Sequence, residues 1–157
     1  MLNKELVQIW EAMGMLTMEK VGAKFTYGIA KNKKLILPFV KEFDKMRIPS
    51  PEFMEYDQER MTLCGEYSEK NDDGEAKING EGNFALIEEK REEFEKALVD
   101  LKGKHDEAFK IENGRAEEYT EVMETEVDIE LWNIQLDDCP SMAEDIMGVL
   151  MDVIIEP

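Results

Sequence analysis

Apolar residues recur every three or four positions through the first third of the chain, which predicts two amphipathic helices. Asn3 can cap the first helix, and Glu5 suits its first turn. The apolar positions of that helix are Leu6, Ile9, Trp10, Met13 and Leu16. Residues 17–22 read as a connection to the second helix, which Pro38 should kink or divide. The apolar face of the second helix comprises Phe25, Ile29, Ile36, Val40 and Phe43.

A third helix is predicted to begin where Ser50 can act as N-cap and Pro51 fits the first helical position. Its apolar residues are Phe53, Tyr56, Leu63 and Tyr67. Beyond this helix, residues 71–74 and 79–80 are turn signals that bracket a short stretch at 75–78. We therefore expect a hairpin or an ordered loop in this region.

The longest apolar pattern starts near Asn83 and is spaced in sevens, which is typical of a helix that packs along a neighbouring helix. Its positions are Ile87, Phe94, Leu98, Leu101, His105 and Ala108. Arg91 in the same seam favours a bundle helix over a long coiled coil. Asn113 and Gly114 should end the helix, and residues 115–125 should form another.

The apolar period changes to two at Val127, which makes this region the best strand candidate in the chain. Val127, Ile129 and Leu131 alternate with acidic residues, and a one-residue shift continues the series. The shifted positions are Trp132, Ile134 and Leu136. A last helix should open at Ser141, because Ser141 and Glu144 match a capping box. Its apolar face comprises Ile146, Val149, Leu150, Val153 and Ile154.

These elements predict a mainly α (α+β) fold, a helical bundle with a small β hairpin or edge strand. The 157 residues are 43% hydrophobic, which is enough for a core that buries roughly 70% of the unfolded surface. No internal repeat or linker is evident. We therefore expect one domain over residues 1–157, with a basic N-terminal third and a strongly acidic C-terminal third.

Charge is distributed unevenly along the chain. The formal net charge is −18, with +4 in residues 1–47 and −13 in residues 112–157. Such a surface disfavours nucleic acid and anionic membranes as direct partners. Residues 24–47 do combine bases with aromatic residues, a pattern that by itself suggests nucleic-acid contact. Pairing of these bases with the protein's own acidic surface, or with that of a second copy, explains them as economically.

No motif for catalysis or cofactor binding stands out. The chain has no phosphate-binding loop, zinc-protease motif or nucleophile elbow. Cys64, Cys139 and the lone histidine, His105, read as packing residues, and residues 71–75 match a calcium loop poorly. We therefore expect no enzyme, catalytic residue, cofactor or metal, with a paired-carboxylate hydrolase as the minority alternative. No apolar stretch approaches the ~18 residues of a membrane span.

Several segments together carry a family resemblance. They are LNKEL, GAKFTYGIAKNKKLILPFVKEFDKMR, NDDGEAKINGEGN, VDIELWNIQL and MAEDIMGVLMDVIIE, in this order. This order resembles a family of small uncharacterised proteins of tailed phages and prophages, from which residues 102–125 depart by being longer. The resemblance implies a viral origin and a location in the cytoplasm of a bacterial host or in the virion. It brings no activity or catalytic residues with it.

Two functions follow from the charge pattern and the resemblance. The first is a DNA-mimic inhibitor, whose carboxylates occupy a basic groove on a host nucleic-acid-binding or defence protein. Its candidate residues are Glu117, Glu118, Glu121, Glu124 and Asp128. The alternative is a phage virion or tail assembly accessory, in which basic and acidic thirds meet between copies or on a virion partner. For any one of these carboxylates, a solubilising role is the simpler interpretation.

Overall fold

The computed structural model describes residues 1–16 and 21–155 and confirms a mainly α fold with a small β element. The predicted connection at 17–22 lies largely outside the described residues. The described chain divides into two compact units, and the expectation of one domain stays a prediction. The first unit comprises Met1–Arg47 and Glu117–Pro157, and the second comprises Ile48–Ala116. Each unit has buried residues of its own.

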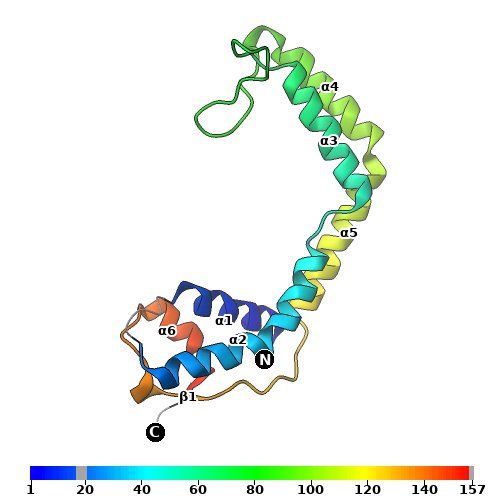
Figure 1. The fold of residues 1–157 in the computed structure, drawn as a ribbon. Helices are drawn as coiled ribbons and strands as arrows, with labels where there is room; N and C mark the ends of the chain where they lie inside the picture. The colour runs from blue at the N-terminus through cyan, green and yellow to red at the C-terminus, as the bar shows by residue number, and fades with distance from the viewer. Residues whose placement is uncertain (17–20, 156–157) are drawn as a thin grey trace. The chain divides into compact units, whose positions relative to one another are not determined.

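The described part of the first unit contains whole helices and a small sheet (Figure 1), together with the end of α5 (Asp106–Met123) and the short helix η2 (Leu136–Asp138). The whole α-helices are α1 (Asn3–Met15), α2 (Ala23–Met46) and α6 (Glu144–Leu150). Strand β1 (Ile134–Gln135) pairs in parallel with β2 (Ile154–Ile155), with Ile134 opposite Ile154. The most deeply buried apolar side chains of this unit are Leu6, Ile9, Met13, Phe25, Ile29, Ile36, Leu150 and Val153.

Two predictions about the first helices need correction. Asn3 is the first residue of α1 and not its cap, because Leu2 occupies the cap position and donates its N–H to Glu5 Oε2 at 2.7 Å. Pro38 lies inside α2 without dividing it, while the alternative of a kink stays a prediction. Because Ile36 and Phe43 are buried on either side of it, packing offsets the hydrogen bond that proline removes.

The strand predicted from Val127 is shorter and later than expected. Residues 127–133 are extended but belong to no strand ladder. The ladder begins only at β1. The last helix begins at Glu144 with no side-chain cap, so the predicted capping role of Ser141 is wrong. Met142 lies in the extended lead-in to α6 and packs against the core. Ile154 belongs to β2 and not to the helix, because it pairs with Ile134.

The second unit contains α3 (Pro51–Glu66), the short helix η1 (Glu88–Lys90), α4 (Arg91–Lys104) and the first part of α5 (Asp106–Met123). Ser50 caps α3 as predicted, since its Oγ accepts from Phe53 N–H at 3.1 Å. Helices α3 and α4 pack side by side (Figure 1). Phe53, Tyr56 and Phe109 form an aromatic cluster with ring centroids 4.7 to 5.5 Å apart.

The helices after residue 88 differ from the prediction at both of their breaks. The chain interrupts the predicted long helix at His105, the C-cap of α4, while Asn113 and Gly114 lie within α5. The residues that flank Asn113 and Gly114 form hydrogen bonds to a segment outside α5. Glu112 Oε2 accepts from Ser50 N–H at 3.1 Å, and Arg115 Nη2 donates to the Ile48 carbonyl at 2.6 Å. These contacts come from residues distant in sequence, so the local Asn-Gly signal does not prevail.

The turn-rich region between α3 and η1 is an ordered loop that contains two copies of one turn. The Oδ1 atoms of Asn71 and Asn79 each accept two backbone N–H groups, and each turn has a glycine at positive φ, Gly74 or Gly82. Residues 71–75 and 79–83 therefore adopt the same kind of turn. Three backbone hydrogen bonds link Glu69, Lys77 and Ala85 in a ring. Lys77 N–H donates to the Glu69 carbonyl, Ala85 N–H to the Lys77 carbonyl, and Glu69 N–H to the Ala85 carbonyl.

Candidate functional site

The predicted acidic residues all lie in the first unit, on the last turns of α5 and the chain that follows it. Glu117, Glu118 and Glu121 are exposed on α5. Glu117, Glu121 and Glu124 are spaced by four and three residues, which places them along one face as the helix ends. Like charges at this spacing repel one another. The row is therefore suited to contact with cations and not to internal packing.

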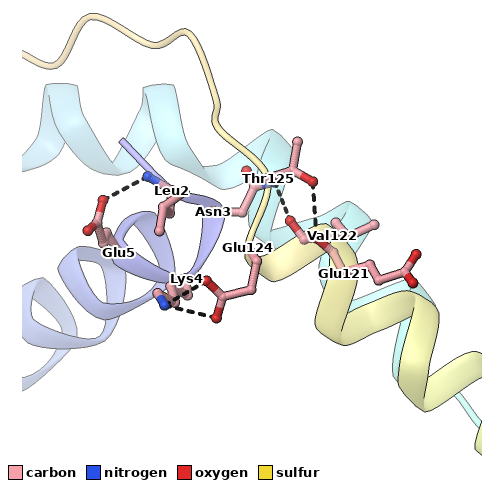
Figure 2. Close-up of polar contacts among 8 residues, drawn as sticks. All are labelled: Leu2, Asn3, Lys4, Glu5, Glu121, Val122, Glu124 and Thr125. Atoms are coloured by element: carbon pink, nitrogen blue, oxygen red, sulfur yellow. Dashed lines mark hydrogen bonds and ion pairs between the residues drawn. The ribbon is translucent and has the colours of Figure 1, made fainter.

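The N-terminus of α1 anchors the end of α5 (Figure 2). Asn3 Nδ2 donates to the Val122 carbonyl at 2.8 Å, and Asn3 N–H donates to the Thr125 carbonyl at 3.0 Å. The Val122 carbonyl also accepts from Thr125 N–H at 3.1 Å, so Asn3 adds a second bond to this group and the first one to the Thr125 carbonyl. They hold the acidic end of α5 in a defined position on the first unit.

Glu124 differs from the other predicted residues because it is already paired. Lys4 Nζ lies 2.7 Å from Glu124 Oε2, and both side chains are about half exposed (Figure 2). The Glu121 side chain points away from this pair in the same view. Glu124 is thus a structural contact between α1 and the end of α5, and it is the weakest of the five candidates for binding a partner.

Exposed acidic residues continue along the chain at 126–130, beyond the end of α5. Glu126, Asp128 and Glu130 are exposed, while Val127, Ile129 and Leu131 between them pack against the core of the unit. An extended chain points successive side chains to opposite faces, about 6.6 Å apart on each face. Glu126 and Glu130 were missed in the sequence prediction, although the apolar alternation that predicted the strand already placed them beside Asp128.

A second surface feature, centred on Trp132, was not predicted. The Trp132 ring is 48% exposed and lies edge-on to Tyr27, which is 53% exposed, with centroids 5.8 Å apart. Lys31 Nζ lies 5.4 Å from the Trp132 ring centroid and 5.8 Å from that of Tyr27. Exposed aromatic residues beside a cation are typical of protein-binding hot spots. We call Tyr27, Lys31 and Trp132 the aromatic platform.

Two residues of α2 set the position of this platform. Asn32 is fully buried and hydrogen-bonds both backbone groups of Trp132. Gly28 allows the chain to approach closely, because a Cβ at this position would lie 2.6 Å from Ile134 Cγ1. An asparagine and a glycine within one helical pattern were the available sequence signals. They were not interpretable without knowing which segment packs there.

The basic region on α2 is largely exposed and only partly paired. Lys24 Nζ lies 3.6 Å from Asp138 Oδ1, and Lys45 Nζ lies 2.6 Å from Glu42 Oε1. Lys34 and Lys41 are exposed, with no ion pair among the residues that the structure describes. The expected pairing of these bases with the acidic part of the chain is therefore seen at Lys24, whereas Lys45 pairs within α2.

Residues considered for catalysis lie elsewhere. His105 is mostly buried against Tyr56, and its Nε2 lies 3.3 Å from Glu59 Oε1. The bond from Lys104 lowers the pKa of the Glu59 carboxyl, with a smaller contribution from His105. Burial raises the pKa of the Cys139 thiol, and Cys64 is buried. Over residues 1–16 and 21–155, no three His, Cys, Asp or Glu side chains are grouped so as to hold a metal ion.

None of the described helices is both long enough and apolar enough to cross a membrane. No known family model, curated protein sequence or solved structure matches the chain.

Proposed function

We propose that the protein is a non-enzymatic binding protein that presents its acidic surface to a basic surface on a protein partner. One observation carries the proposal. Exposed carboxylates follow one another from the end of α5 into the extended chain, and within the described structure only Glu124 of this series is paired with a cation. The members of this acidic row are Glu117, Glu118, Glu121, Glu124, Glu126, Asp128 and Glu130. Such a surface steers a basic partner and repels acidic ones.

The regular spacing of the row supports the more specific proposal of a DNA mimic. One helical turn separates Glu117 from Glu121, about 6 Å along the axis, and alternate residues of an extended chain are separated by a similar distance. A rigid array of negative charges competes with phosphates for basic side chains, most strongly at low salt. The resemblance to phage proteins makes a nucleic-acid-binding or defence protein in a bacterial host cytoplasm the proposed target.

A charge-matched affinity capture tests this function. Three baits are compared. They are the wild-type protein, the row variant (Glu117→Gln, Glu121→Gln and Asp128→Asn) and the loop control (Asp72→Asn, Asp73→Asn and Glu81→Gln). The control removes the same formal charge from the loop of the second unit. Each bait is incubated with bacterial lysate at low and moderate salt, and bound proteins are challenged with duplex DNA.

The expected result is capture of a DNA-binding protein that duplex DNA releases. The row variant should lose it, and the loop control should retain it. Equal loss in both variants would show that net charge alone is responsible. Capture that neither variant affects would exclude the acidic row as the binding surface.

The aromatic platform favours a second candidate, a structural or assembly accessory of a phage particle. Aromatic contacts supply affinity in stable interfaces, and the exposed bases of α2 can select an acidic partner or the acidic row of another copy. Sedimentation of the wild-type protein and of Trp132→Ala, alone and mixed with purified virion proteins, distinguishes this role. A complex that Trp132→Ala dissolves and the row variant leaves intact would favour assembly over mimicry.

A further inference from the structure

The extended segment 127–133 has the features of a strand without a partner strand. Its side chains alternate between the core and solvent from Val127 to Leu131, as in a half-buried strand. Yet the backbone N–H and C=O groups of residues 128–131 and of Asn133 have no hydrogen-bond partner within the described parts of the chain. A row of unpaired backbone groups on an extended chain is a template for another strand.

Both ends of this segment are fastened, so it is held extended before any partner arrives. At one end, Val127 N–H donates to the Met1 carbonyl at 2.9 Å, and Glu126 forms an antiparallel bridge with Leu2. At the other end, Asn32 holds Trp132, and Ile134 N–H donates to the Val153 carbonyl at 2.8 Å. A preformed strand loses little conformational entropy on pairing, which favours binding.

One edge of the segment is the better template. In a regular strand, backbone groups of alternate residues point to opposite edges, so we expect those of Ile129 and Leu131 on the edge that Val127 uses. The unpaired groups of Asn133 follow them, past the point where the alternation of side chains ends at Leu131. Residues 125 and 127 share this phase, and they already pair with residues 1–3. The free edge, defined as the backbone of Ile129, Leu131 and Asn133, therefore continues an edge already used for antiparallel pairing.

Charge determines which strand fits. Side chains of paired residues lie next to each other on one face of a sheet, and like charges directly opposite are destabilising. If the same segment of a second copy paired here, Asp128 and Glu130 would meet acidic residues of that copy. A strand with Lys or Arg at alternate positions would instead form cross-strand ion pairs with them. A hollow of about 500 Å³ beside the segment is lined equally by apolar residues and by Lys31, Glu130 and Asn133, and it offers space for a side chain of the added strand.

We infer that the free edge receives a strand from the protein partner, by backbone pairing at Ile129, Leu131 and Asn133 and by ion pairs from alternate basic side chains to Asp128 and Glu130. The inference rests on the proposed function and adds the mode of recognition. Backbone bonds supply affinity in such strand addition, and alternate side chains supply specificity.

The test uses defined peptides and the whole protein. A short labelled peptide of alternating lysine and valine is titrated against the protein, beside a peptide of the same composition with all lysines first and an alternating glutamate and valine peptide. Binding is followed by fluorescence polarisation, and amide exchange is followed by NMR. The first peptide should bind most tightly and slow exchange at Ile129, Leu131 and Asn133 on the order of tenfold.

A matched pair of variants isolates the backbone contribution. Asn133→Pro removes one unpaired N–H, whereas Asn133→Ala keeps it, and the side chain of Asn133 is exposed. Proline is also compatible with an extended residue before it, here Trp132. With far-UV circular dichroism unchanged, Asn133→Pro should bind the alternating basic peptide about tenfold more weakly than Asn133→Ala, the effect of one hydrogen bond.

Three results would overturn the inference. They are equal binding by the two Asn133 variants, equal binding of the alternating and block peptides, and binding without slower exchange at the free edge. A cellular partner that the row variant loses but Asn133→Pro retains would overturn strand addition and leave the proposed function standing. If neither variant loses a partner, the proposed function fails, and the peptide experiments still decide whether the edge accepts a strand.

Discussion

The side-chain amide of Asn32 pairs with the backbone of Trp132 as a neighbouring strand would. Asn32 Nδ2 donates to the Trp132 carbonyl at 2.9 Å, and Trp132 N–H donates to Asn32 Oδ1 at 2.6 Å. Both backbone groups of a residue at the surface are thus satisfied from inside α2. The bonds fix the point at which the acidic extended chain meets the core, and they support the aromatic platform.

Asn32→Ala should destabilise the protein by about 2–4 kcal/mol, because it leaves two backbone groups without partners and opens a void at a fully buried position. Urea unfolding followed by tryptophan fluorescence measures the effect. The control is Asn133→Ala, which removes an exposed side-chain amide next to Trp132. It should change stability by less than about 0.5 kcal/mol. Equal effects would show that the Asn32 bonds contribute little.

Gly28→Ala should destabilise the protein by about 1–3 kcal/mol, although alanine is the better helix former. The new Cβ would lie 2.6 Å from Ile134 Cγ1, and Ile134 is buried, so the clash is not easily relieved. Gly114→Ala is the matched control within α5, where nothing lies within 4 Å of the added Cβ. That change should stabilise by about 0.5–1 kcal/mol. Thermal melts of the two variants should therefore shift in opposite directions.

Asn3→Ala should cost about 0.5–1.5 kcal/mol of stability, the net contribution of one hydrogen bond, because the Val122 carbonyl loses the Nδ2 donor at 2.8 Å but keeps Thr125 N–H. The loss should be concentrated at the end of α5, where hydrogen exchange of residues near Thr125 should accelerate. Asn113→Ala, at an exposed position within α5, serves as control and should be neutral or slightly stabilising. Unchanged exchange near Thr125 in Asn3→Ala would contradict this anchoring role.

Glu59 should contribute to stability at neutral pH and lose that contribution in acid. Its pKa is lowered from the ordinary value of 4.5, chiefly by the hydrogen bond from Lys104. A carboxyl whose pKa is lower in the folded state stabilises fully above its unfolded pKa, and the contribution disappears as pH falls through the folded pKa. Glu59→Gln should therefore reduce stability at neutral pH and make the decline in acid less steep. Urea midpoints measured from pH ~7 to ~3 test this, with exposed Glu55→Gln as the charge-matched control.

Element type was predictable because it depends on local pattern, whereas element ends depended on distant contacts. Ser50 and Pro51 begin α3 as predicted, since capping uses residues three positions apart. Gly114 does not end α5, because Glu112 and Arg115 contact residues 48–50. The strand pattern after Val127 correctly predicted alternating burial through Leu131, but a strand ladder also requires a partner chain.

The candidate site divides in the same way. Sequence alone determined which carboxylates are exposed, because charged residues opposite an apolar face or at alternate positions of an extended chain must face water. Tertiary structure decided that Glu124 pairs with Lys4, 120 residues away, and that Asn32 holds Trp132, 100 residues away. No local periodicity encodes such contacts. They arise only when packing of the apolar faces brings polar groups together, and each buried polar group must then find a partner.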